Sequence, residues 1–193
     1  MLRKPSLAAV ITCTAFLCPV GLQSSAQTGT QTPATSSSPT LEVTLKFIGD
    51  FMTAESPVSY TETDNAFKDK PETYSFSYRD FRQEGCVLRY GIDERTTDER
   101  LKYDRSKDFS KLLPLAIRIQ TVAEYEAQIV ASEPALRGTT YTISPEVYIV
   151  RMSKSFDSDD MNFYFNDRQG AERVMKAVNH AIELCGGAKD QPF

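Results

Sequence analysis

Histidine, tryptophan and runs of basic residues are scarce in this sequence, and their scarcity excludes several classes of function. The chain has one histidine and no tryptophan, and its 22 lysines and arginines against 26 acidic residues give a formal net charge of −4. A single histidine excludes most histidine-dependent catalysis and histidine-rich metal sites. An acidic balance without a basic block argues against a nucleic acid as the partner.

Long apolar stretches are also lacking, except for one near the N-terminus at residues 7–20, which carries no charge. Arg3 and Lys4 precede this stretch, and the small residues Ser24-Ser25-Ala26 follow it. This arrangement is typical of a secretory signal peptide, so we expect residues 1–26 to be cleaved on export. No later apolar run is long enough to span a bilayer, so we expect no stable membrane insertion after cleavage.

Two alternatives to cleavage stay open. An uncleaved apolar segment would anchor the chain, and lipidation at Cys13 or Cys18 would tether it. Lipidation needs a small residue before the cysteine, and Thr12 and Leu17 stand there instead. The expected location is therefore outside the cytoplasm, either periplasmic or secreted.

Composition divides the remainder into a linker and one domain. Residues 27–40 contain threonine, serine, glutamine and proline but no charge, so they cannot bury enough surface to offset the entropy of ordering. We expect a disordered linker there and a single folded domain over residues 41–193. A domain of that length is large enough for one core.

The start of the domain permits two structures. At helical spacing, Leu41, Leu45, Ile48 and Met52 form one apolar stripe, and Thr40 can cap the first turn. At strand spacing, apolar and polar residues alternate from residue 41 to residue 47. We favour a helix over residues 41–54, because the strand alternation fails at Ile48 while the helical stripe continues.

The middle of the chain alternates between apolar and polar residues, which is typical of antiparallel strands with one wet face. The turn Gln83-Glu84-Gly85 lies between two such runs and predicts a hairpin. Residues 94–105 mix both charge signs densely, which suits an exposed edge strand, and residues 122–132 fit either an extended segment or a short helix. In all, we expect about seven strands, near residues 73–78, 86–92, 101–103, 115–119, 139–143, 146–152 and 161–165.

The end of the chain predicts a long amphipathic helix. Ala171, Val174, Met175, Val178 and Ile182 share one helical face, and Gly186-Gly187 provides a stop. Asn166 followed by Gln169 resembles a capping box at the helix start. An apolar face on such a helix needs a sheet to cover it.

These elements give the expected fold class: α+β, with an antiparallel β-barrel or two packed sheets between an N-terminal helix and a long C-terminal helix. The run MNFYF (residues 161–165), leading directly into DRQGAERVMKAVNHAIELCGG (residues 167–187), resembles the pleckstrin-homology-like superfold. The same segment is similar to the end of small exported bacterial proteins of unassigned function that close on ELCGG.

The resemblance implies two modes of binding. Members that bind phosphoinositides use basic residues in the first hairpin, but Lys68 and Lys70 here stand among Asp64, Asp69 and Glu72, so that pattern is not met. Members of the phosphotyrosine-binding type add a peptide as an extra strand beside the C-terminal helix, and nothing in the sequence argues against that mode.

Cys86 and Cys185 are the two cysteines outside the predicted signal peptide. An even pair in an oxidising compartment usually forms a disulfide, and both residues belong to core-facing runs. We expect them to be bonded, which would close a loop of about 100 residues and stabilise the fold by up to about 4–5 kcal/mol. The alternative is two buried, inert thiols.

Other reactive residues have simpler explanations. His180 should face solvent beside Lys176 and Glu183, on the polar side of its helix. Asp157, Asp159 and Asp160 could collect a divalent cation, but they lack the glycine and distant glutamate of a calcium loop and better fit a solvated hairpin tip. We find no nucleophile motif or phosphate loop, and we expect no catalytic residue, metal or cofactor.

The resulting hypothesis is a non-catalytic exported module that binds a peptide, a protein or a small apolar molecule of the cell envelope or exterior. One alternative is a small hydrolase that uses carboxylates or a metal. The other is a helix-grip carrier, in which a curled sheet and the long helix enclose an apolar ligand.

Overall fold

The apolar stripe near the start of the domain forms a helix, α1 (Leu41–Ala54), and not the alternative strand. Its N-cap is Thr40, whose side-chain oxygen accepts a hydrogen bond from the N–H of Val43 at 3.3 Å. The helical prediction is confirmed, because helical geometry places the apolar side chains at positions 45, 48 and 52 on one face, whereas strand alternation would separate them. Fully buried members of that face are Leu45, Ile48 and Met52.

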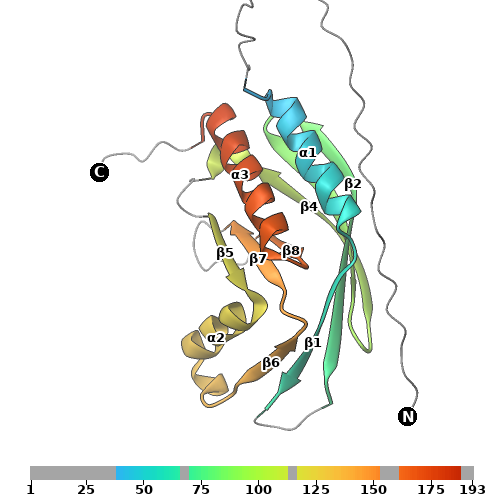
Figure 1. Cartoon of the computed structure of the whole chain (residues 1–193), viewed down its shortest axis with the longest axis vertical. Coiled ribbons are helices and arrows are strands. Elements are labelled where there is room, and N and C mark those ends of the chain that lie inside the picture. The colour runs from blue at the N-terminus through green and yellow to red at the C-terminus, as the bar shows by residue number, and fades with distance from the viewer. Residues whose placement is uncertain (1–37, 66–69, 113–116, 153–160, 188–193) are drawn as a thin grey trace, which may run out of the picture. The chain divides into compact units, whose positions relative to one another are not determined.

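The computed structural model describes residues 38–65, 70–112, 117–152 and 161–187, shown in colour in Figure 1. The other two helices are α2 (Val122–Ser132) and α3 (Arg168–Leu184). The strands are β1 (Val58–Asp64), β2 (Glu72–Glu84), β3 (Val87–Arg95), β4 (Arg100–Asp108), β5 (Ile117–Thr121), β6 (Tyr141–Ser144), β7 (Tyr148–Met152) and β8 (Met161–Phe165).

The strands form two antiparallel sheets. One has the order β4-β3-β2-β1-β6, and the other has the order β5-β7-β8. The α+β class and the pair of antiparallel sheets are confirmed, but the barrel alternative is wrong. Among the described strands, β4 pairs only with β3 and β6 pairs only with β1, so the larger sheet keeps two open edges.

Local sequence signals explain the hairpins and caps. Gly85 adopts a φ of +60°, which suits glycine, at the predicted turn between β2 and β3. Thr121 and Glu124 form a reciprocal capping box that decides α2 in favour of a helix. The predicted cap of α3 is wrong, because Asp167 and not Asn166 accepts the hydrogen bond from the Gly170 N–H, at 2.8 Å.

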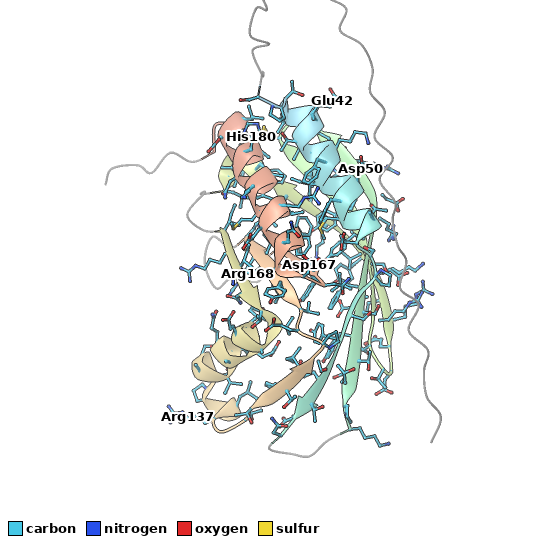
Figure 2. All side chains as sticks on the ribbon, viewed as in Figure 1. Glu42, Asp50, Arg137, Asp167, Arg168 and His180 are labelled. Carbon is cyan, nitrogen blue, oxygen red and sulfur yellow. A yellow bond between two sulfur atoms is a disulfide. The ribbon has the colours of Figure 1, made fainter. Side chains whose placement is uncertain are left out.

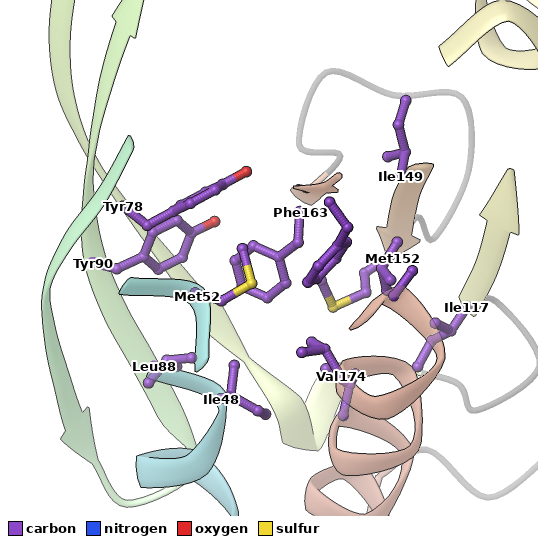
Figure 3. Packing of buried hydrophobic residues seen from close by; sticks show 14 of the residues in the cluster. Ile48, Met52, Tyr78, Leu88, Tyr90, Ile117, Ile149, Met152, Phe163 and Val174 are labelled. Atoms are coloured by element: carbon purple, nitrogen blue, oxygen red, sulfur yellow. The ribbon is translucent and has the colours of Figure 1, made fainter. Parts of the chain in front are cut away.

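The two terminal helices lie side by side and cover different sheets. α1 packs on α3 and β2, whereas α3 packs on β5, β7 and β8 (Figure 1). Gly49 allows α1 to approach the larger sheet closely, because a Cβ there would lie 2.8 Å from the Cβ of Phe81. α1, the larger sheet, the smaller sheet and α3 all contribute side chains to one core. Its members include Met52, Tyr78, Tyr90, Phe163 and Val174 (Figure 3).

Tyr78 of β2 joins the two sheets through hydrogen bonds. Its buried hydroxyl accepts a hydrogen bond from the N–H of Tyr164 at 3.0 Å and donates one to the carbonyl oxygen of Asn162 at 3.4 Å. Both partners are backbone groups of β8, on the edge opposite its ladder with β7. Tyr78 therefore provides hydrogen-bond partners for two backbone groups on the edge of β8 that no described strand pairs.

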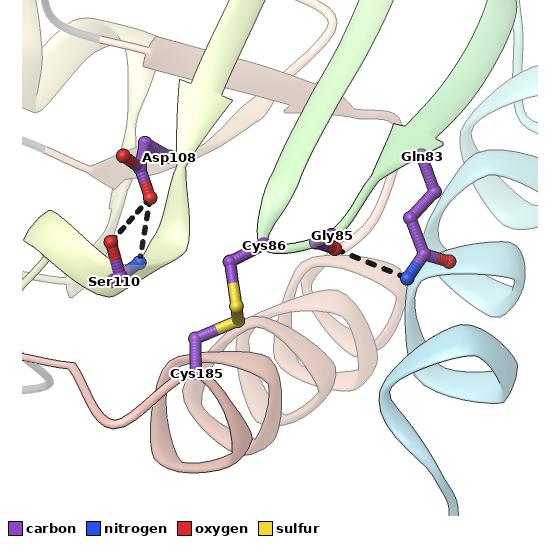
Figure 4. The surroundings of a disulfide bond; sticks show 6 residues. All are labelled: Gln83, Gly85, Cys86, Asp108, Ser110 and Cys185. Carbon is purple, nitrogen blue, oxygen red and sulfur yellow. Dashed lines mark hydrogen bonds between the residues drawn. A yellow bond between two sulfur atoms is a disulfide. The ribbon is translucent and has the colours of Figure 1, made fainter.

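The predicted disulfide is confirmed. Cys86, at the turn between β2 and β3, is bonded to Cys185 at the end of α3, with a Cα–Cα distance of 5.8 Å (Figure 4). The bond ties the C-terminal helix to the larger sheet, although that helix rests mainly on the smaller one.

We predict that Tyr78→Phe lowers the free energy of unfolding by about 1–3 kcal/mol, because it leaves two buried backbone groups of β8 unpaired. Urea denaturation followed by near-UV circular dichroism measures the loss. Tyr90→Phe is the matched control, since the Tyr90 ring is equally buried and its hydroxyl makes no hydrogen bond within the described residues. Equal losses in the two variants would contradict the bridging role.

We also predict that replacing both Cys86 and Cys185 with serine lowers the free energy of unfolding by up to about 4–5 kcal/mol. Without the bond, the denatured chain is no longer closed into a loop and gains conformational entropy. Thermal unfolding of the double variant against the oxidised protein tests this. A melting temperature unchanged by the double substitution would show that the bond adds no stability.

Candidate functional site

The site with the most strongly perturbed chemistry lies where β1 and β2 face α2 and β8. We call it the tyrosine–glutamate cluster; it consists of Tyr60, Glu62, Glu72, Tyr74, Glu126 and Tyr164. Strand alternation places Tyr60 and Glu62 on the same face of β1, and the register sets Tyr60 opposite Tyr74 and Glu62 opposite Glu72. The Tyr60–Tyr74 and Glu62–Glu72 pairs therefore follow from the strand register alone.

Aromatic stacking connects the cluster to the smaller sheet. The rings of Tyr60 and Tyr74 stack with centroids 5.1 Å apart, and Tyr164 of β8 stacks on Phe76 at 4.1 Å with an interplanar angle of 3°. Tyr60 and Tyr164 lie 6.4 Å apart, centroid to centroid. These stacked rings form one wall of the cluster.

Glu62 carries the most unusual carboxyl group of the described residues. Burial, followed by the negative charges of Glu126, Glu72 and Asp64 in that order of importance, raises its pKa to about 7. A carboxyl group with a pKa near 7 is half protonated at neutral pH, so it can donate or accept a proton there.

Glu126 reaches the cluster from α2, the helix that the Thr121–Glu124 capping box begins. Burial raises the pKa of Glu126 as well. Both carboxylates contribute to raising the pKa of Tyr60, after the larger effect of its burial, so the Tyr60 hydroxyl stays protonated at physiological pH. The hydroxyl of Tyr74 donates a hydrogen bond to Glu72 at 2.7 Å.

Within the described part of the chain, the negative charges of the cluster are not neutralised, and aromatic rings border them. No lysine or arginine of the described residues forms an ion pair with Glu62 or Glu126, and no described cation lowers the pKa of Glu62. A positively charged group would relieve the repulsion between the carboxylates and contact aromatic surface. In the part of the chain that the structure describes, no three acidic, histidine or cysteine residues lie close enough to hold a metal ion.

The charges on the β3–β4 hairpin form a different kind of cluster. Asp93 accepts a hydrogen bond from the Arg100 Nε at 2.9 Å, which together with Lys102 and Arg95 lowers the pKa of Asp93 to about 2. These groups neutralise one another on the outer face of the hairpin. They fit the predicted wet edge strand and need no ligand.

The histidine expected to face solvent is half-buried. The Nε2 atom of His180 lies 2.9 Å from the carbonyl oxygen of Pro39, and its Nδ1 atom lies 3.7 Å from the carboxylate of Glu183. Its position beside Glu183 is confirmed, but full exposure is wrong, because the segment before α1 passes over this side of α3. The His180 ring therefore contacts other residues of the protein and is not fully exposed to solvent.

The remaining sequence candidates divide into two groups. Cys86 and Cys185 are consumed by the disulfide. The acidic group Asp157, Asp159 and Asp160 lies outside the described residues, as does Lys68.

Sequence reasoning missed the cluster because it missed β1. Val58 and Tyr60 are the only large apolar residues of that strand, and hydroxyl residues and acids fill the rest. One signal was available: Glu62 continues the period-two face of Val58 and Tyr60, which places an acid on an apolar face. The contribution of Glu126 from α2 had no local signal.

Comparisons of the chain with protein-family models, curated proteins and solved structures give no significant match. Among the described residues, no helix has both the length and the apolar character needed to cross a bilayer.

We predict that Glu62→Gln stabilises the protein at pH 8 by about 1 kcal/mol and changes little at pH 5. A carboxyl group with a raised pKa in the folded state binds its proton more tightly there, so stability is full below pH 4.5 and falls as the pH rises through 7. Glu62 is partly exposed, and solvent screening keeps the effect small. Melting temperatures of both proteins from pH 4 to pH 8.5 test this, and parallel curves would contradict it.

Proposed function

We propose that the chain is an exported, non-catalytic binding module that takes a cationic group of a peptide or protein partner at the tyrosine–glutamate cluster. The observation that carries this proposal is the pair Glu62 and Glu126, two partly buried carboxyl groups with raised pKa values and no described cation beside them. Such a pair costs folding energy, and a cationic partner would recover part of that cost.

The aromatic walls specify the kind of cation. Tyr74 and Tyr164 are only partly buried and lie beside the carboxylates, so a guanidinium or ammonium group could contact a ring face and a carboxylate together. Arginine suits this environment best, because its planar guanidinium stacks on rings and pairs with carboxylates. The formal net charge of −4 would also attract a basic partner at long range.

Two wider expectations support the same proposal. The disulfide suits a periplasmic or secreted location, because such bonds persist in oxidising compartments. The direct passage from β8 into α3 supports the proposed pleckstrin-homology-like relationship, in which peptide docking beside the C-terminal helix is a common mode.

A carboxylate-dependent hydrolase is the second candidate. The same observation favours it, because a glutamate with a pKa of about 7 can act as a general acid. The helix-grip carrier has less support, because the described space between the helices and sheets is filled by side chains such as Met52 and Phe163.

The test uses a short peptide with two adjacent arginines and a second peptide in which citrulline replaces both, which removes the charge and keeps the shape. We expect the arginine peptide to bind the full chain, as measured by calorimetry at pH 8, and the citrulline peptide not to. Glu62→Gln and Glu126→Gln should each weaken binding about tenfold, since each removes one charge-assisted contact. Affinity should fall from pH 8.5 to pH 5.5 as Glu62 gains its proton.

Glu133→Gln is the matched control, because Glu133 is an exposed acid at the end of α2, outside the cluster. Equal affinity of the two peptides, or equal effects of all three variants, would overturn the proposal. Turnover of a peptide or ester that is lost in Glu62→Gln would instead establish the hydrolase.

A further inference from the structure

One exposed face of α1 carries an apolar surface that includes no residue of the tyrosine–glutamate cluster. An open hollow lies on this face, lined among the described residues by Val43, Lys46, Phe47, Asp50 and Phe51. Val43 is 56% exposed, although the opposite face of the helix is fully buried. Phe47 and Phe51 pack partly against the core, but a helix that covers a core normally turns a polar face to solvent, and the exposed apolar strip that continues from these rings to Val43 is not needed for that packing.

Two phenylalanines give the strip its shape. Phe47 and Phe51 are one helical turn apart, and their ring centroids lie 5.6 Å from each other. Both rings are partly exposed along the side of α1 that faces α3. A spacing of four residues matches the spacing of apolar side chains along a second amphipathic helix.

Arg173 of α3 supplies the charge beside these rings. Its guanidinium carbon lies 4.7 Å from the centroid of Phe51 and 5.6 Å from that of Phe47. Arg173 forms no ion pair with any described carboxylate, whereas Lys46 on the same face is already paired with Asp50, within one turn of α1 (Figure 2 labels Asp50). The uncompensated charge next to the apolar strip is therefore positive.

We propose that the face formed by Val43, Phe47, Phe51 and Arg173 docks an amphipathic segment of another protein, one that carries apolar side chains at helical spacing and an aspartate or glutamate next to them. The apolar side chains would lie on the two rings, and the carboxylate would pair with Arg173. Charge complementarity selects an acidic segment, because a basic one would place two cations side by side.

The shape of the surface selects a protein segment over a small molecule. Small-molecule sites are concave and enclose most of the ligand, whereas this hollow is open along one helix. An extended, shallow strip suits a helix that lies across it. The strip is short, so we expect weak binding with a dissociation constant in the micromolar range.

The experiment uses the full chain and a labelled helical peptide about 15 residues long, with leucines four residues apart and one glutamate beside them. A second peptide has lysine in place of that glutamate. Fluorescence anisotropy should show that the glutamate peptide binds about tenfold more tightly than the lysine peptide. Arg173→Glu should reverse this preference, and Val43→Glu should weaken binding of both peptides.

Two controls separate docking from folding and from general stickiness. Leu101→Glu makes the same kind of change at a residue that is 41% exposed on β4, and it should leave binding unchanged. Unaltered melting temperatures of the variants would show that the fold is intact. The proposal is wrong if Arg173→Glu leaves the preference between the two peptides unchanged, or if Leu101→Glu and Val43→Glu act alike. Neither outcome affects the tyrosine–glutamate cluster, whose residues are all unchanged.

Discussion

The junction between two sheets that share no backbone ladder is the constraint on which the rest of this structure depends. Each sheet is complete within itself, so their joint position rests on side chains. Tyr78 supplies two hydrogen bonds to the unpaired edge of β8, and Phe163 packs edge-on against the Tyr78 ring, with centroids 5.7 Å apart. Because buried polar groups are normally paired, this hydroxyl favours the arrangement in which β8 lies beside β2.

The same junction creates the candidate binding site. Once β8 lies against the larger sheet, Tyr164 stacks on Phe76 and closes one side of the tyrosine–glutamate cluster. Glu62 is then held in partly desolvated surroundings near Glu126. This placement costs folding free energy, which the packing of the core offsets. Surroundings that disfavour the local charge are common at functional sites, because stability elsewhere in the fold offsets the local cost.

Helix faces and hairpins were predictable because their causes are local. The stripe of α1, the turn at Gly85 and the face of α3 each depend on residues close together in the chain. The disulfide was predictable because only two cysteines lie outside the segment predicted to be a signal peptide. By contrast, β1 went unrecognised: its inner face mixes valine, tyrosine and glutamate, and only contact with β2 and α2 makes an acid there tolerable.

By itself, the sequence determined the helices α1 and α3, the strands from β2 to β8, and that Cys86 and Cys185 would pair, since periodicity, capping and redox chemistry act over short distances or by elimination. Only the tertiary structure decided that the strands divide into two open sheets instead of one barrel. It also decided that Glu62, Glu126 and Tyr164 meet. Those outcomes depend on contacts between residues far apart in the chain, whose energies no local pattern records.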